Sequence, residues 1–196
     1  DHRDLHSFPT RRSSDLIERE AERLGALVRE ILTLERLGAG VIEPRAIALG
    51  ELLRGVGEDA RFEARERDVE VVVEAPDATI DADPELLRRA IENVARNAIR
   101  FAPAGTAVEL TLTTAGGAAS VTVSDRGPGV PDHELARIFE PMVRLEAHRD
   151  PAHPGAGLGL AIAQRAVEAH GGAIRARNRD GGGLEVTLVL TNLHTS

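Results

Sequence analysis

Cysteine, tryptophan and tyrosine are absent from the 196-residue sequence, and methionine occurs once. Without cysteine the chain has no disulfides and no thiolate ligands for a metal, which suits a reducing compartment. Lysine is absent too, so all 24 basic residues are arginine. With the abundant alanine and glycine, this indicates a GC-rich genome rather than a chemical requirement.

Long apolar runs and basic patches are also missing. No run reaches the length of about 18 residues that a transmembrane helix needs, and no signal-peptide pattern occurs. The formal net charge of -8 argues against a nucleic-acid partner. The apolar fraction of 42% is enough for a sizeable core, and the length suits one α/β domain with an appendage. We expect no direct contact of this chain with a membrane.

The first fifteen residues do not resemble part of a folded domain. Residues 6–15 read His-Ser-Phe-Pro-Thr-Arg-Arg-Ser-Ser-Asp, which resembles one reading frame of a common sequencing-library adapter. We therefore predict that residues 1–15 are an artefactual tail and that the natural protein is longer upstream. An ordinary disordered tail is the alternative, because chain termini are often poorly ordered.

Residues 16–40 carry a helical pattern. Apolar residues repeat in it at spacings of three and four with charges between them, namely Leu24, Leu27, Ile31 and Leu34. This repeat is typical of a coiled-coil seam. A lone amphipathic helix of this length needs a partner, which is either another helix or the rest of its own domain. Residues 41–45, which include Pro44, form a linker.

Strand and helix patterns alternate from residue 46 onward. We expect strands at 46–49, 69–74 and 79–81, helices at 50–67 and 84–101, a hairpin at 106–113 and 119–124, a short helix at 131–139, a helix that ends at His170, and a closing hairpin at 173–178 and 184–190. Asp83 is a suitable N-cap for the second helix, with Pro84 at its first position. The pattern predicts a two-layer α/β fold.

Two asparagines stand out in the helix expected at 84–101. Asn93 and Asn97 lie four residues apart, so they share one helix face. A separate apolar stripe for the core consists of Leu87, Ile91, Val94 and Ala98. Asparagine is a poor mid-helix residue, because its side chain competes for backbone hydrogen bonds. An amide oxygen suits Mg²⁺ as a hard, neutral ligand, so the pair indicates a metal site. A polar face exposed to solvent is the alternative.

A carboxylate follows the strand expected at 119–124. Val121, Val123 and Asp125 alternate, so Asp125 points inward if the valines face the core. A buried carboxylate needs hydrogen-bond donors, and the exocyclic amine of adenine would supply one. Gly127 and Gly129 follow, and glycines allow a ligand to approach the backbone closely. The alternative is a strand that ends in an Asp-initiated turn.

A glycine-rich stretch precedes the helix that ends at His170. It reads Gly155-Ala156-Gly157-Leu158-Gly159, and backbone amides at such a helix start can bind phosphate. The spacing differs from Gly-x-Gly-x-x-Gly and no strand directly precedes it, which argues against a dinucleotide-binding fold. A glycine-rich linker is the alternative. The polar residues 146–154, with two prolines, are as expected of a mobile lid. We expect His170 itself to lie on the surface.

Four motifs in this order resemble the boxes of the GHKL (HATPase) ATPases. They are the asparagine helix, the Asp125 turn, Phe139-Glu140-Pro141-Met142-Val143-Arg144 and the glycine stretch. Over about residues 46–191 the chain resembles the C-terminal catalytic ATP-binding domain of sensor histidine kinases. The resemblance implies an α/β (α+β) two-layer sandwich of the GHKL/Bergerat type, with a mixed β-sheet and with ATP between the helices and the lid. Residues 16–40 would be one helix of the dimerisation and phosphoacceptor hairpin.

The resemblance also implies roles for individual residues. Asn97 would ligate Mg²⁺ through its amide oxygen, with Asn93 supporting it directly or through water. Asp125 would read adenine. The other residues implied at the ATP site are Arg100 at the phosphates, Phe101 against adenine, Gly127 and Gly129 in the adenine pocket, Arg144 from the lid, and Gly155, Gly157, Leu158 and Gly159 around the phosphates. Met142 stands where the family has an aromatic residue, and Ala156 where it has Gln or Thr, which removes one polar contact.

The implied function is that of a two-component sensor histidine kinase. It would transfer the γ-phosphoryl group of Mg-ATP to a histidine on the hairpin domain, and thence to a response regulator. The implied assembly is a homodimer, in the cytoplasmic part of a membrane-anchored bacterial sensor. No His-Glu-x-x-x-Pro-like acceptor motif occurs in the 196 residues, so we expect this chain to bind Mg-ATP without phosphorylating itself.

Other functions fit parts of the same pattern. An anti-sigma-factor-type Ser/Thr kinase shares the superfamily, but the coiled-coil-like helix ahead of the domain argues against it. A non-catalytic nucleotide-binding regulatory module would bind ATP without turnover. A chaperone or topoisomerase ATPase would want a glutamate near Asn93 to activate water, and Glu92 lies about 100° away around the helix.

Overall fold

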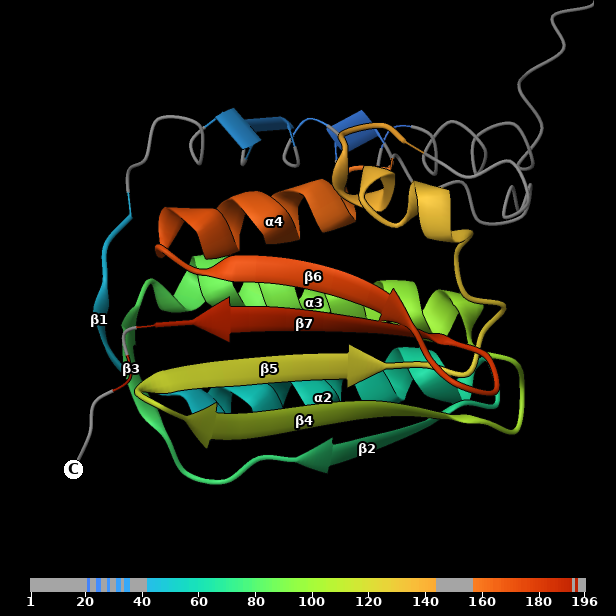
Figure 1. Ribbon diagram of the computed structural model, residues 1–196, viewed down its shortest axis with the longest axis horizontal. Coiled ribbons are helices and arrows are strands. Elements are labelled where there is room, and N and C mark those ends of the chain that lie inside the picture. Colours follow the sequence, from blue (N-terminus) through green and yellow to red (C-terminus); the bar gives the residue numbers. More distant parts are fainter. Residues whose placement is uncertain are drawn as a thin grey trace, which may run out of the picture.

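A mixed sheet and three helices make up most of the described chain. The computed structural model describes residues 42–143, 157–191 and 193, and residues 21, 24, 25, 28, 31, 32, 34 and 35 ahead of them. The strands are β1 (Arg45–Ala48), β2 (Glu70–Glu74), β3 (Thr79–Ala82), β4 (Ala107–Ala115), β5 (Ala118–Ser124), β6 (Ala173–Asn178) and β7 (Leu184–Leu190) (Figure 1). The helices are α2 (Leu49–Arg65), α3 (Pro84–Phe101) and α4 (Gly159–Ala169).

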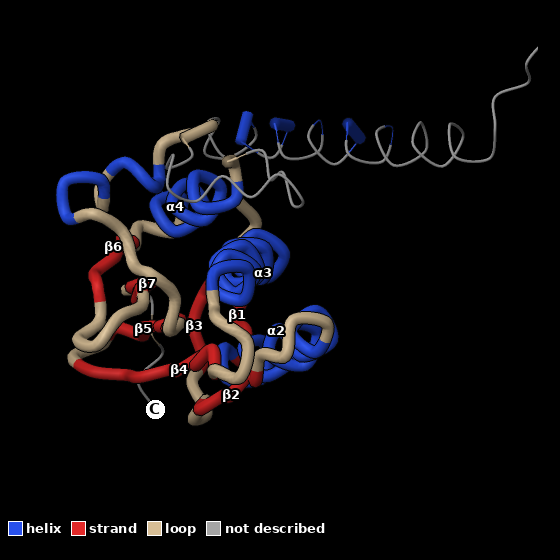
Figure 2. Tube along the Cα trace, turned by 90° about the vertical axis from the view of Figure 1, so that its right-hand side faces the viewer, coloured by secondary structure: helices blue, strands red, loops and turns tan. Residues whose placement is uncertain are grey.

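The strands of the main sheet lie in the order β2-β4-β5-β7-β6. β2 and β4 are parallel, and the other three pairings are antiparallel. The three helices lie together on one side of this sheet, as Figure 2 shows. β1 and β3 form a separate antiparallel pair beside one end of the sheet (Figure 1). The expected two-layer α/β sandwich with a mixed sheet is confirmed.

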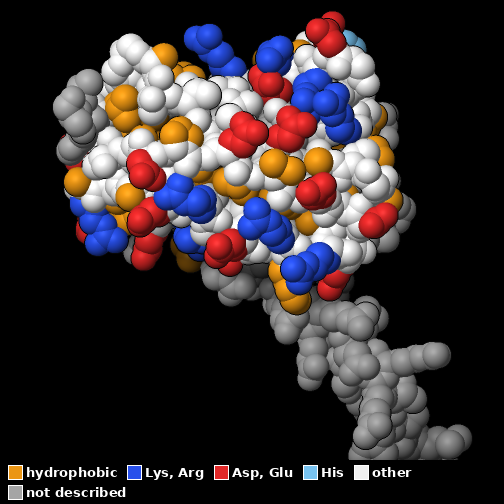
Figure 3. Space-filling model, turned by 90° about the horizontal axis from the view of Figure 1, so that it is seen from below, with side chains coloured by type: hydrophobic (Ala, Val, Ile, Leu, Met, Phe, Trp, Pro, Cys, Tyr) orange, Lys and Arg blue, Asp and Glu red, His pale blue; other side chains and the backbone are white. Residues whose placement is uncertain are grey.

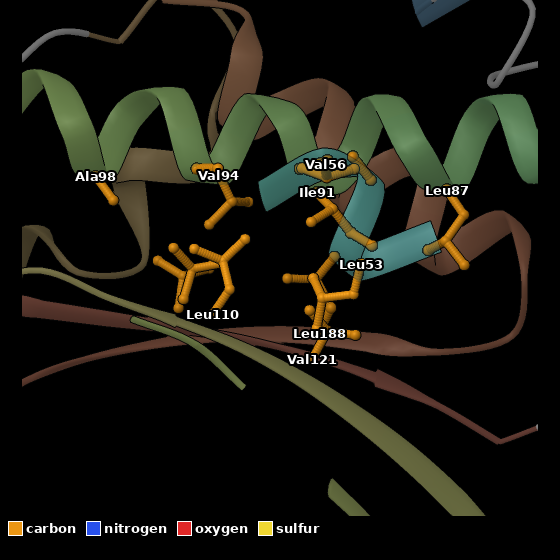
Figure 4. Close-up of a cluster of buried hydrophobic side chains, with 14 of the residues drawn as sticks. Leu53, Val56, Leu87, Ile91, Val94, Ala98, Leu110, Val121 and Leu188 are labelled. Atoms are coloured by element: carbon orange, nitrogen blue, oxygen red, sulfur yellow. The ribbon is translucent and has the colours of Figure 1, made fainter. Parts of the chain in front are cut away.

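α3 packs its apolar stripe directly on the sheet. The four residues expected in this stripe are at most 4% exposed, namely Leu87, Ile91, Val94 and Ala98. They point toward buried side chains of the central strands, among them Leu110, Val121 and Leu188 (Figure 4). Along β7 every second residue is buried, which is the period expected of a strand with one covered face. This packing positions α3, the helix that carries the asparagine pair.

α3 begins as the sequence predicts. Oδ1 of Asp83 accepts hydrogen bonds from the backbone N–H groups of Glu85 and Leu86, both at 3.1 Å. Pro84 occupies the first helical position, where an N–H would have no partner within the helix. The cap therefore fixes where the asparagine helix starts.

The prediction of a short helix at 131–139 is wrong. The chain forms two 3-10 turns there, Asp132–Glu134 and Arg137–Phe139. In these turns only Phe139 is buried. A segment this short, with no continuous apolar face, gains too little from packing to sustain an α-helix.

α2 lies close against β2 at a glycine. A Cβ at Gly57 would collide with Cγ2 of Val73, so a larger residue would push the helix off the strand. Two ion pairs join α2 to α3, namely Arg88–Asp59 at 2.9 Å and Arg96–Glu63 at 3.3 Å. Acidic and basic side chains are interspersed across the face of the molecule in Figure 3. Exposed pairs contribute only about 0–1 kcal/mol each, so packing holds these helices in place.

The described residues between 21 and 35 are all helical, in agreement with the helical pattern of residues 16–40. Four of their apolar side chains are 39% to 60% exposed, namely Leu24, Val28, Ile31 and Leu32. The other residues of this segment and the tail 1–15 lie outside the described residues. Within the described part of the chain, no helix is long and apolar enough to cross a membrane.

Candidate functional site

The asparagine pair of α3 lies beside the start of α4. A Cβ at Gly159 would lie 3.4 Å from Oδ1 of Asn93, so the first residue of α4 packs on this amide. Asn93 and Asn97 are one helical turn apart, and both are half-buried. The fold thus brings Gly159, the last glycine of the stretch 155–159, to the asparagine face of α3.

The chain enters α4 through Gly157 and Leu158. Gly157 has φ of +73°, and its carbonyl accepts a hydrogen bond from the N–H of Met142 at 2.9 Å. Leu158 is 1% exposed and belongs to the hydrophobic core, so its side chain serves packing rather than ligand contact. Arg144, Gly155 and the expected lid at 146–154 lie outside the described residues.

Asp125 projects inward after β5, as the alternation predicts. Val121 and Val123 are at most 1% exposed, and Asp125 is 4% exposed. Its Oδ1 accepts hydrogen bonds from the backbone N–H groups of Gly127 at 2.7 Å and Leu184 at 3.2 Å. Burial raises the pKa of the Asp125 carboxyl, and the two hydrogen bonds oppose that rise. The result is a desolvated carboxylate, held in one orientation, that favours a hydrogen-bond donor as its ligand.

The end of α3 meets the Asp125 turn at Gly127. A Cβ at Gly127 would lie 2.7 Å from the carbonyl oxygen of Phe101 and 2.9 Å from Oδ1 of Asp125, so a larger residue would separate the two. The guanidinium of Arg100 lies 5.4 Å from the centroid of the Phe101 ring, a cation–π distance. Residues 93–101 extend about 12 Å at the helical rise of 1.5 Å per residue. One side of α3 therefore leads from the glycine motif at Asn93 to the buried carboxylate.

Two residues that hold the Asp125 turn carry no signal in the sequence. Asn178 accepts a hydrogen bond from the N–H of Val130 at 2.9 Å and donates to the carbonyl of Val130 at 2.7 Å. Arg179 donates to the backbone carbonyl of Asp125 at 3.1 Å. Both lie where β6 turns into β7, and the local pattern there shows only a glycine-rich hairpin.

His170 is buried, so the expectation of a surface position is wrong. Its side chain is 4% exposed. Nε2 accepts a hydrogen bond from the backbone N–H of Asp83 at 2.9 Å, so Nδ1 carries the proton and donates to the carbonyl of Ala166 at 2.6 Å. The interior tolerates this polar ring because both nitrogens have partners. His170 joins two helix ends and takes no part in the candidate site.

The oxygen donors at this site restrict the metal that it could hold. Among the described residues no group of three or more His, Asp or Glu side chains is arranged to bind a metal ion. Asn93 and Asn97 offer neutral amide oxygens. Mg²⁺ is octahedral and is commonly held by one or two protein ligands, waters and substrate phosphates. The amides therefore fit Mg²⁺ in company with the phosphates of a nucleotide.

A comparison with known protein families identifies the chain. Residues 82–193, more than half of the chain, match the family described as histidine kinase-, DNA gyrase B-, and HSP90-like ATPase. The chain belongs to this ATPase family. The matched range starts directly before the N-cap of α3 and includes all the candidate site residues of this ATPase domain.

Sensor kinases are prominent among the relatives of this ATPase domain. The sensor protein CutS of Streptomyces coelicolor is 35% identical over 170 residues, which cover 86% of this chain and 41% of CutS. The sensor histidine kinase CpxA of Escherichia coli is 32% identical over 177 residues, which cover 89% of this chain and 38% of CpxA. The chain thus spans about two fifths of the length of these relatives.

Two solved structures resemble the ATPase domain closely. Full-length ShkA in complex with AMPPNP has a TM-score of 0.81 and 36% identity, over 94% of this chain and 39% of ShkA. The mycobacterial sensor histidine kinase MprB has a TM-score of 0.69 and 31% identity, over 76% of this chain and 98% of the solved MprB chain.

Proposed function

We propose that this chain is the ATP-binding catalytic part of a two-component sensor histidine kinase. Support comes from the ATPase family, from the sensor kinases among its relatives and from the row of residues along α3. ATP lies along this helix, with its phosphates beside Asn93, Asn97 and the start of α4, and with its adenine at Asp125. ShkA was solved in complex with AMPPNP, which supports a nucleotide as the ligand of this chain.

Each site residue has a chemical task in this proposal. Asn97 supplies an amide oxygen to Mg²⁺, and Asn93 supports the ion directly or through water. Phe101 packs on the adenine ring, and Asp125 accepts a hydrogen bond from its exocyclic amine. The remaining contacts come from Arg100 and Arg144 at the phosphates, from Gly127 and Gly129 at the adenine, and from the backbone of Gly155, Gly157, Leu158 and Gly159 around the phosphates.

The reaction is a phosphoryl transfer. A ring nitrogen of the acceptor histidine attacks the γ-phosphorus, the bond from that phosphorus to the bridging oxygen breaks, and ADP leaves. Bound Mg²⁺ offsets the charge of the phosphates, and the chain's own residues position the reactants. Because the acceptor imidazole is the nucleophile, no general base is needed in this chain. The phosphoryl group then passes to an aspartate of a response regulator.

The orientation of Glu92 favours phosphoryl transfer over ATP hydrolysis. Its carboxylate pairs with Arg88 at 3.3 Å, and Arg88 also pairs with Asp59 of α2 at 2.9 Å. Glu92 is therefore directed toward α2, whereas Asn93 faces Gly159 of α4. A chaperone or topoisomerase ATPase needs a carboxylate beside the γ-phosphate to activate water. Glu92 lies on the wrong side of α3 for that task.

The domain plan and partners follow from the same proposal. Residues 16–40 belong to the dimerisation hairpin, 41–45 are a linker, and 46–191 are the catalytic domain. The exposed apolar side chains between residues 24 and 32 fit a helical partner, which supports the homodimer that the resemblance to sensor kinases implies for the full-length protein. ThkA, whose fold is similar at 24% identity and a TM-score of 0.74, was solved in complex with the response regulator protein TrrA. We assign a response regulator as partner, and a place in the cytoplasmic part of a membrane-anchored sensor.

Titration of a fluorescent ATP analogue, with and without Mg²⁺, tests this function. The chain should bind the analogue, Asn97→Ala should lose the Mg²⁺ dependence, and Asp125→Ala should lose the preference for adenine. Arg96→Ala is a matched control, because Arg96 adjoins Asn97 in sequence but pairs with Glu63 of α2. A folded chain that does not bind, or binding that neither site variant changes, would overturn the proposal.

Incubation with labelled Mg-ATP separates the kinase from its alternatives. The chain has no acceptor motif, so it should bind ATP without forming phosphohistidine. Phosphohistidine on these 196 residues would contradict that expectation. Rapid hydrolysis of ATP by the chain alone would favour the chaperone and topoisomerase class.

A further inference from the structure

The segment between Asp125 and Val130 carries the proposed adenine contact but belongs to no helix or strand. Its inner side is fixed by the backbone of β7, because Asp125 exchanges hydrogen bonds with Leu184. The N–H of Asp125 donates to the carbonyl of Leu184 at 3.0 Å, and the N–H of Leu184 donates to Oδ1 of Asp125 at 3.2 Å. Side chains from the β6–β7 turn hold the two ends of the segment.

Arg179 holds the first end. One terminal nitrogen of its guanidinium donates to the carbonyl of Asp125 at 3.1 Å, and the other donates to Oε2 of Glu109 at 3.0 Å. The side chain is only 16% exposed, so these charge-assisted bonds are partly shielded from water. The N–H of Arg179 donates to the carbonyl of Gly183 at 2.9 Å, which closes the turn beneath it. Arg179 thus connects β4, the β6–β7 turn and the backbone of Asp125.

Asn178 holds the second end. Its Oδ1 accepts a hydrogen bond from the N–H of Val130, and its Nδ2 donates to the carbonyl of Val130. Nδ2 also donates to Oδ1 of Asp132 at 2.9 Å. The orientation of the amide is determined, because the N–H of Val130 can only donate. A Cβ at Gly129, which has φ of +72°, would lie 2.7 Å from Oδ1 of Asn178. The segment is therefore pressed closely against this amide.

We infer that Arg179 and Asn178 are positioning residues for base selectivity. They clamp residues 125–130 from the β6–β7 turn, so that the Asp125 carboxylate keeps one position toward the exocyclic amine of the base. The inference rests on the proposed role of Asp125 in ATP binding. Without the clamp, the segment can shift while the buried side chains of β5 and β7 stay packed. The carboxylate would then discriminate poorly between purines.

Competition binding of ATP and inosine triphosphate tests this clamp. Inosine carries a carbonyl oxygen where adenine carries the amine, so it repels a fixed carboxylate. The parent should prefer ATP by about tenfold or more, since a hydrogen bond to a charged group is involved. Arg179→Met and Asn178→Ala should each lower that ratio several-fold. Arg179→Lys keeps the charge but reaches only one of the two acceptors, so its ratio should lie between those of the parent and Arg179→Met.

Arg177→Met is the matched control. Arg177 lies on the same hairpin and pairs with Glu185 at 2.6 Å, with 71% of its side chain exposed, and it should keep the parent's ratio. A variant that merely lowers the folded fraction weakens the binding of both nucleotides equally, and that result would overturn the inference. So would an unchanged ratio in Arg179→Met when the parent prefers ATP. A parent without preference would overturn the proposed role of Asp125 as well.

Amide hydrogen exchange without nucleotide gives a second, independent readout. The N–H of Gly127 is bonded to Oδ1 of Asp125 at 2.7 Å, so it reports the carboxylate's position directly. It should exchange faster in Arg179→Met, while the amides that pair β5 with β7 keep their protection. Equal protection of Gly127 in the parent and the variant would count against the clamp.

Discussion

The imidazole of His170 accepts a hydrogen bond from the backbone N–H of Asp83 across 2.9 Å, and this bond ties the end of α4 to the start of α3. The other ring nitrogen donates to the carbonyl of Ala166 at 2.6 Å. Ala166 is in the last turn of α4, where carbonyls have no partner within the helix. One buried ring thus satisfies a group at each of two helix ends.

His170→Leu should destabilise the domain by about 2–4 kcal/mol, because the N–H of Asp83 and the carbonyl of Ala166 both lose a partner while the volume is roughly kept. Urea denaturation at neutral pH measures this loss. His133→Leu is the control, since the side chain of His133 is 81% exposed and its replacement should change stability by no more than about 0.5 kcal/mol. Equal stability of the two variants would show that the bonds of His170 contribute nothing.

Asp83 also binds the chain ahead of β1. Its Oδ2 accepts a hydrogen bond from the N–H of Glu43 at 3.2 Å, while its Oδ1 caps α3. Asp83→Ala should cost about 1 kcal/mol through loss of the cap. Asp83→Asn keeps an oxygen for the cap but presents an amide NH2 group, which cannot accept, to the backbone N–H of Glu43. Both variants should speed exchange of the Glu43 amide, and only Asp83→Ala should lower the denaturation midpoint. A Glu43 amide that is as well protected in both variants as in the parent would rule out this link.

The sequence predicts the candidate site better than it predicts what supports the site. Asn93, Asn97 and Asp125 are visible in it because helix and strand periods assign each to a face. Arg179 and Asn178 lie 54 and 48 residues from their partners, Asp125 and Val130. Those contacts depend on β7 pairing with β5 as well as with β6, and local periodicity contains no information on strand order.

His170 illustrates the same limit. It lies 87 residues from Asp83, and the pattern around it shows only a helix that ends before two glycines. The strands and helices themselves were largely predictable, because each has one buried face. The segment at 131–139 was not, since its few apolar residues do not distinguish a helix from two 3-10 turns.

Gly183→Ala should weaken ATP binding and lower stability together. A Cβ there would collide with the carbonyl oxygen of Asp125, and the residue has φ of +111°. Gly181→Ala is the matched control, because Gly181 has φ of +82° but nothing within 4 Å of the added Cβ. The control should lose about 1–2 kcal/mol of folding stability through backbone strain and keep its ATP affinity. Denaturation and nucleotide titration of the two variants measure the difference, and matching affinities would contradict the expected collision.

Asp125→Asn should separate stability from binding. Asparagine keeps an oxygen for the N–H groups of Gly127 and Leu184 but places an amide NH2 group where the second carboxylate oxygen lies. That NH2 group and the exocyclic amine of adenine are both hydrogen-bond donors, so ATP affinity should fall by about tenfold or more. The apo domain should be at least as stable as the parent at neutral pH, because a buried charge is removed.

The pH dependence of that stability difference follows from the direction of the pKa shift. Burial raises the pKa of Asp125 above its ordinary value of 3.8, so the folded state holds this proton more tightly than the unfolded state does. The carboxyl therefore stabilises the fold most below about pH 3.8, and this contribution is lost as the pH rises through the folded-state pKa. The stability of Asp125→Asn relative to the parent should accordingly increase from about pH 4 toward neutrality and then level off. Urea denaturation at intervals across this range measures it, with exposed Asp180→Asn as the control for the loss of one charge. A relative stability that stays constant, or falls with rising pH, would mean that hydrogen bonds and not burial dominate at this carboxylate.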